Sequence, residues 1–172
     1  MDVITLGVCK IDFTLDGGNA VEISKTLEEQ DTIFTAPYET NKIKFDQLAG
    51  AQAGNHYISD EPTLTCSVEL DLDTLPDLTG VYQAGAVSGL GMAAHGQAIQ
   101  FGAINVHPIS AGDSNTDHDI IGKRVYCVVT NQVEYKNEGK TRADLVFYFS
   151  ANPEETDADY GMPFTIGTYS ES

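Results

Sequence analysis

Apolar and polar residues alternate most regularly between positions 62 and 73. The polar positions end in three carboxylates, Glu69, Asp71 and Asp73. A period of two residues is that of a β-strand whose two faces have different surroundings. The sequence therefore predicts a half-buried strand with one apolar face and one acidic face. The apolar positions are Leu64, Cys66, Val68, Leu70 and Leu72.

The residues directly after this strand follow a helical period instead. Leu75, Leu78 and Tyr82 recur at a spacing of three to four residues, which places them on one side of a helix. Asp73 or Thr74 can cap its first turn. We predict one short helix, packed through this apolar stripe.

Alternation recurs in shorter segments along the rest of the chain. It predicts an early hairpin at residues 9–24, a short strand at 43–46, two short strands within 97–109, and a late hairpin with strands at 124–135 and 142–150. Repeated short strands and one helix indicate a mainly β fold, a β-sandwich or barrel with a flanking α-helix. The length fits a single domain over residues 1–172.

Three segments lack this alternation. Residues 25–41 are polar and acidic and predict a long loop, which inside a compact domain is usually functional. Residues 48–56 and 85–96 are rich in Gly and Ala and predict further loops; the role of the second is left open. Residues 160–172 predict a short C-terminal extension with an apolar patch.

Charge and cysteine content narrow the classes of function. Twenty-six acidic residues against nine basic ones give a net charge of −17, which disfavours binding to nucleic-acid phosphates or anionic lipids. We see no secretory signal and no apolar run near the roughly 20 residues of a membrane span, so we expect no membrane partner. The three cysteines lie on apolar strand positions, which predicts buried free thiols in a reducing compartment.

The candidate chemical motifs are incomplete. Asp113, Asn115 and Asp117 match the first ligands of a calcium loop, but His118 and Arg124 occupy the positions that need Gly and Glu. The four histidines are scattered, and no serine has the surroundings of a nucleophile. We expect no metal, no cofactor and no enzymatic activity. A β-sandwich module binding calcium or another ligand through residues 110–119, within a virion or cell-surface assembly, stays open as the alternative.

The order of these features resembles that of bacteriophage major tail tube proteins. The resemblance is carried by the hairpin CKIDFTLDGGNAVEIS, the long acidic loop after it, the segment KIKFDQLAGAQAGNHYISDEPTLTCSVELD, and the helix LDTLPDLTGVY. It continues through the late hairpin RVYCVVTNQVEYKNEGKTRADLVFYF to the ending MPFTIGTYSE, which looks like the F-x-I-G ending of that family. It spans nearly the whole chain.

This resemblance implies a structural virion protein, assembled in the host cytoplasm, whose subunits form hexameric rings. The rings stack into the phage tail tube, through which genomic DNA passes on ejection without specific binding. Sheath, tape-measure and tail-terminator proteins are further implied partners, and type VI secretion tube proteins share the architecture. An acidic lumen suits such a conduit, because basic residues would hold the DNA through its phosphates.

Two sets of residues are candidates for these roles. We expect the outward positions of the central strand and the late hairpin to line the lumen; these are Glu69, Asp71, Glu134 and Asp144. Alternatively they lie on the outer face or form ion pairs between neighbours, with Arg124 and Arg142 as partners. We expect the 25–41 loop and the C-terminal patch to contact neighbouring subunits, through Ile33, Phe34, Tyr38, Met162, Phe164 and Ile166.

Overall fold

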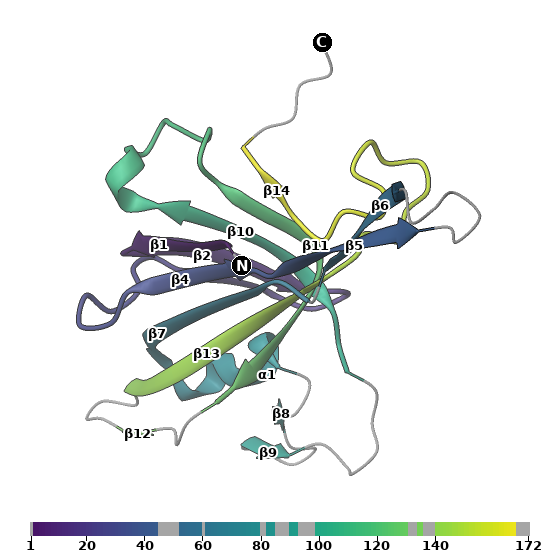
Figure 1. The fold of residues 1–172 in the computed structure, drawn as a ribbon. Helices are drawn as coiled ribbons and strands as arrows, with labels where there is room; N and C mark the ends of the chain where they lie inside the picture. The colour runs from purple at the N-terminus through teal and green to yellow at the C-terminus, as the bar shows by residue number, and fades with distance from the viewer. Residues whose placement is uncertain are drawn as a thin grey trace.

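The computed structural model describes residues 2–44, 52–59, 61–79, 82–84, 90–92, 99–130, 134–135 and 140–167. Its main element is an antiparallel sheet (Figure 1), which confirms the mainly β fold with one short α-helix. The strands run in the order β1-β4-β7-β13-β11-β10-β2-β3, while β12 pairs with β13 and β14 with β11. They are β1 (Asp2–Gly7), β2 (Cys9–Leu15), β3 (Ala20–Ile23), β4 (Thr32–Ala36), β7 (Thr63–Asp71), β10 (Gly102–Pro108), β11 (Ile120–Val129), β12 (Glu134–Tyr135), β13 (Lys140–Ser150) and β14 (Thr165–Ile166).

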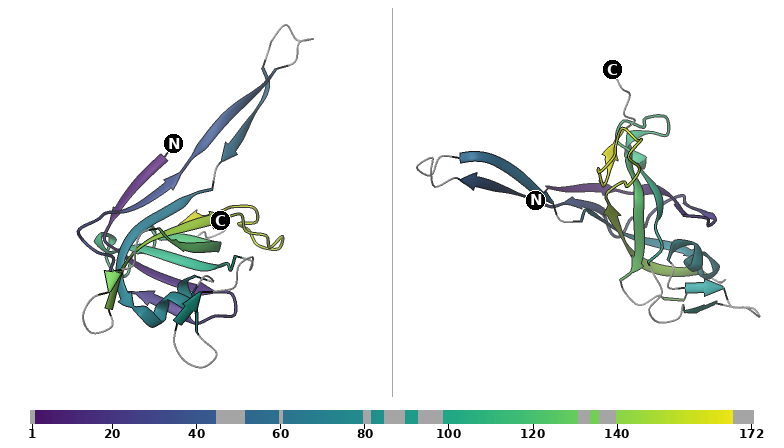
Figure 2. Two further views of the ribbon diagram at one scale, coloured as in Figure 1. Left: turned by 90° about the horizontal axis from the view of Figure 1, so that it is seen from below. Right: turned by 90° about the vertical axis from the view of Figure 1, so that its right-hand side faces the viewer.

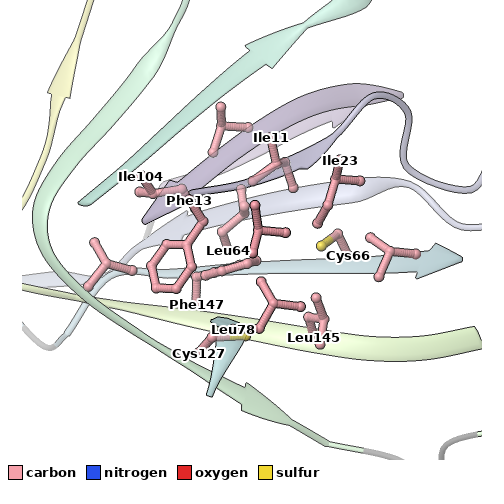
Figure 3. Close-up of a cluster of buried hydrophobic side chains, with 14 of the residues drawn as sticks. Ile11, Phe13, Ile23, Leu64, Cys66, Leu78, Ile104, Cys127, Leu145 and Phe147 are labelled. Atoms are coloured by element: carbon pink, nitrogen blue, oxygen red, sulfur yellow. The ribbon is translucent and has the colours of Figure 1, made fainter. Parts of the chain in front are cut away.

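The sheet curls around one hydrophobic core. The ring centroids of Phe13 on β2 and Phe147 on β13 lie 5.3 Å apart (Figure 3), although two strands, β11 and β10, lie between β2 and β13 in the sheet. The segment after β3 bridges β2 and β7, because the Thr26 N–H donates to the Cys9 carbonyl and the Leu27 N–H to the Ser67 carbonyl. The predicted apolar faces of β2, β7, β11 and β13 all point into this core.

The helix is shorter than the sequence predicts. A 3₁₀ turn at Leu72–Thr74 leads into α1 (Leu75–Leu78), which buries both of its leucines beside β2 and β3. Thr74 occupies the N-cap position without a side-chain hydrogen bond. The backbone becomes extended at Thr79, so Tyr82 begins β8 (Tyr82–Ala84), which pairs with β9 (Leu90–Met92). The rest of residues 85–96 lies outside the described residues.

The prediction of a loop over residues 25–41 is wrong after residue 31. It contains β4 and the start of β5 (Tyr38–Lys44). β4 is an interior strand, paired with β1 on one side and with β7 on the other. Thr32 and Phe34 are buried, so the alternation is present but extends over too few residues to stand out among polar neighbours. Likewise β6 (Gln52–Ser59) occupies much of the predicted 48–56 loop.

Strands β5 and β6 form a two-stranded ribbon that projects from the body (Figure 2). In the part of the chain that the structure describes, these strands pair with each other and with no strand of the main sheet. Isolated two-stranded hairpins are marginally stable in water at best. The ribbon therefore needs a further surface to be held in place.

The three cysteines lie in the core as free thiols, as the sequence predicts. Burial raises the pKa of the Cys9 thiol to about 11 and that of Cys66 to about 12, and it raises the pKa of Cys127 as well.

The thiolate is the reactive form of cysteine. We therefore expect native protein at pH 8 to leave 5,5′-dithiobis(2-nitrobenzoate) unreacted, and the guanidinium-unfolded chain to release three equivalents of thionitrobenzoate, one for each cysteine. Rapid release from native protein would contradict this burial.

Candidate assembly surfaces

Acidic residues outnumber basic residues in this protein by 26 to nine. Every lysine and arginine side chain that the structure describes already has a partner in the same subunit. Arg124 stacks over the Phe101 ring at 4.1 Å. The ion pairs are Lys10–Glu22, Lys25–Glu28, Lys123 with Asp157 and Asp159, Lys140–Asp71 and Arg142–Glu29. With a net charge of −17, the remaining carboxylates give the subunit a strongly negative field.

The structure brings the predicted lumen residues together on one part of the sheet. Glu69 is exposed on β7 and lies opposite Arg142 of β13, which in turn lies opposite Glu134 of β12. Asp71, also exposed, places its carboxylate 2.9 Å from Lys140 Nζ. The side chain of Glu134 lies outside the described residues.

Asp144 is less accessible than Glu69 and Asp71. It is half-buried and accepts a hydrogen bond from the Ser67 hydroxyl. Arg142 Nη1 lies 3.1 Å from Glu29 Oε2 of the same subunit. The alternative from the sequence is that Arg124 and Arg142 form ion pairs with carboxylates of neighbouring subunits. Such pairs would have to displace the Arg142–Glu29 contact and the Arg124–Phe101 stack.

The prediction that Phe34 contacts a neighbouring subunit is wrong for the subunit as folded. Phe34 is 0% exposed, with its ring 5.5 Å from Phe149 and 4.8 Å from Phe164. Phe164 is half-buried by the same contact, so both side chains stabilise the subunit itself. Ile33, one residue earlier on β4, faces the other side and is half-buried. Tyr38 is the first residue of β5, at the base of the ribbon; its side chain lies outside the described residues.

The other two C-terminal residues are available to a partner. Met162 and Ile166 are 51% and 50% exposed. Ile166 lies on β14 beside Ile120 of β11 and lines a groove of about 500 Å³. We call this the apolar groove, because most of its lining is apolar: Ile4, Leu6, Pro108, Ala111 and Ile120 line it beside Ile166, and Thr5, Ser110 and His118 complete it.

The sequence reading missed the strand that forms one wall of the apolar groove. Strand β1 is an edge strand, and its Val3 and Ile4 are 56% and 39% exposed. Its signal is a cluster of β-branched residues, Val3, Ile4 and Thr5, close to the start of the chain. Exposed apolar residues on a sheet edge are typical of an interaction surface.

A second groove, of about 490 Å³, lies on the sheet face that points away from the core. We call it the acidic groove. Carboxylates of the segment before β4 and of β13 surround it, and apolar side chains of β4 and β13 complete it. Its lining includes Glu29, Gln30, Asp31, Ile33, Ser67, Asp144 and Val146. The sequence places Glu29 and Asp31 in an acidic loop but gives no sign that Asp144 faces them.

The proposed calcium segment forms a turn of its own. The Asp117 N–H donates to Asn115 Oδ1 at 3.0 Å, and Asp119 Oδ1 lies 2.6 Å from His107 Nδ1. Among the residues with described side chains, no group of three or more His, Cys, Asp and Glu residues is placed to hold a metal ion. No helix within the described ranges has the length and apolarity to cross a membrane.

Comparison with known proteins adds no family. The chain matches no protein-family model and no curated protein. The likeness to tail tube proteins therefore rests on the order of elements along the chain.

Proposed function

We propose that this chain is a structural subunit that assembles into hexameric rings, which stack into a tube of the phage-tail type. The observation that carries this proposal is the β5–β6 ribbon. It projects from the body and has no strand partner outside itself among the described residues. A surface of a neighbouring copy is the simplest support for such an element, and a ribbon that reaches one neighbour links subunits into a chain or ring.

The main sheet favours the same mode of assembly. It is open, with β1 at one edge and β3 at the other. Open edges invite pairing with further strands, and a ring that joins sheets side by side leaves no edge exposed. The exposed Val3 and Ile4 on β1 would be buried by that step.

The charge of the subunit suits a conduit for DNA. Since the described basic side chains are already engaged within the subunit, the sheet face that carries Glu69 and Asp71 has little to offer a phosphate. A wall of carboxylates repels DNA over about 8 Å at physiological salt, which keeps the polymer away from the wall. In this proposal no enzymatic step and no bound cofactor is involved.

The apolar groove provides a specific test of the contacts. We expect Ile166→Asp to weaken self-association roughly ten- to a hundredfold, because a buried isoleucine contributes about 1.5–3 kcal/mol. The side chain is half exposed in the free subunit, so the melting temperature should stay close to the parent value. Sedimentation velocity measures the association.

The matched control is Ile99→Asp. Ile99 is 61% exposed and does not line the apolar groove, so the same change of charge and size should leave association unaltered. Equal association by parent and Ile166→Asp protein would remove this groove from the assembly.

The proposal itself is tested by light scattering on a size-exclusion column over a range of loading concentrations. The subunit mass is 18.5 kDa, and we expect species of six subunits and multiples of six as concentration rises. A constant monomer mass would reject the tube and leave the ligand-binding module as the remaining hypothesis.

A further inference from the structure

We propose that the acidic groove is the docking site for the β5–β6 ribbon of a second copy, with Lys42 and Lys44 meeting its carboxylates. The inference rests on the proposed function, because it assigns one of the contacts through which the subunits assemble. It names both sides of that contact.

The acidic groove combines negative charge with an apolar floor. Glu29 and Asp31 stand on the segment before β4, and Asp144 stands across from them on β13. Of these, Glu29 is partly neutralised by Arg142, while Asp31 is exposed and has no ion pair within the described part of the chain. Ile33 and Val146 are half-buried in the floor. A bound strand with basic and apolar residues would cover both kinds of surface.

The geometry of the groove is fixed by the fold. Ser67 is almost fully buried, and its hydroxyl contacts both Gln30 and the Asp144 carboxylate. The Leu27 N–H donates to the Ser67 carbonyl, which holds the acidic segment against β7. The carboxylates are therefore arranged before a partner arrives, which lowers the entropy lost on binding.

Strand β5 of the ribbon has a local excess of basic residues. Strand β5 holds Lys42 and Lys44, two of nine basic residues in the protein, against one acidic residue, Glu39. The strand thus has a charge of +1 in a protein of −17. The two lysines are separated by the two-residue period of a strand. Opposite potentials on two surfaces steer association and fix its register.

The groove of the same subunit cannot accept this ribbon. β4 starts beside the acidic segment and runs away from it to Ala36, and β5 continues outward from Tyr38. Figure 2 shows the ribbon extending from the body beyond the end of β4. The acidic groove therefore lies at the start of β4, and the ribbon lies beyond the end of β4. Such an arrangement links copies head to tail, and the chain of copies closes into a ring where the rotation permits.

A charge exchange tests the pairing. We expect Lys42→Glu with Lys44→Glu to reduce self-association at least about tenfold, and Glu29→Lys with Asp31→Lys to do the same, because each places like charges together. Carrying all four substitutions in one chain should restore association, since the charges are then complementary again. Sedimentation velocity at fixed ionic strength reports the association, and thermal melting confirms that each variant is folded.

Two further variants keep the result interpretable. Glu29→Lys also removes the Arg142 ion pair, so Asp31→Lys alone serves as the milder groove variant, with a smaller loss in the same direction. Glu154→Lys with Glu155→Lys matches the charge change of the double groove variant at exposed positions away from the groove, and it should assemble like the parent.

The outcomes separate the two proposals. Restoration in the fourfold variant, after loss in both doubles, supports the docking of ribbon in groove. Parental association by the doubles, or loss that the fourfold variant fails to restore, overturns it while the tube proposal stands. A parent protein that does not associate at all rejects the tube proposal itself.

Discussion

Removing the β5–β6 ribbon is expected to give a folded subunit that no longer assembles. The cut points follow from the register, in which Tyr38 pairs with Ser59 at the base of the ribbon. Replacing residues 39–58 by Asn-Gly joins these two residues through a turn that suits a hairpin. Within the described residues, no strand of the deleted segment pairs with the main sheet, so stability should be retained.

The expected loss of assembly is complete, because the deletion removes the element that we propose reaches a neighbour. Circular dichroism melting establishes that the shortened protein is folded, and sedimentation velocity shows whether it associates. Rings or tubes of the shortened protein would show that the ribbon is not needed for assembly.

A deletion that begins at the start of β4 should instead abolish folding. Removing residues 32–40 takes out β4, an interior strand between β1 and β7 that supplies Phe34 to the core. We expect that variant to unfold. The contrast between the two deletions distinguishes a strand of the body from the ribbon that follows it, which the sequence alone presents as one acidic loop.

The second large effect is expected at Phe34. Phe34→Ala should lower the free energy of unfolding by about 3–5 kcal/mol, the usual range for removing a buried phenylalanine. The ring is fully buried and makes edge contacts with both Phe149 and Phe164, so the resulting cavity would lie between β4, β13 and the C-terminal segment. Guanidinium unfolding measures the change.

The neighbouring residue provides the control. Ile33→Ala removes an apolar side chain from the same strand, but from the outer face, where it is half-buried. Its loss of stability should be about 1 kcal/mol, smaller because less apolar area is involved. If Phe34→Ala left stability unchanged and abolished association, Phe34 would be a contact between subunits after all.

The sequence predicted the strands whose alternation is long. β2, β7, β11 and β13 each have regular apolar positions that the core confirms. β1 was missed because its adjacent Val3 and Ile4 give no apolar–polar alternation, and β4 because its alternation covers only five residues among polar neighbours. Even in β7 the pattern has an exception: Ser67 stands on the polar face, yet the segment before β4 covers it. The alternation of apolar and polar residues along β7 cannot reveal burial by a segment that lies far away in the sequence.

The candidate surfaces were predicted only in part, for a related reason. The apolar C-terminal patch is readable from its residues, and Met162 and Ile166 are indeed exposed. Phe164 has the same hydrophobic character but packs on Phe34, a partner far away in the sequence. Similarly, the acidic groove depends on Asp144 facing a segment more than a hundred residues earlier, which only the folded sheet brings about.

The most direct test of the account is negative-stain electron microscopy of the purified protein over a concentration series at several salt concentrations. We expect the parent protein to form rings and, at higher concentration, hollow tubes with a central channel. Single particles of subunit size under every condition would contradict it.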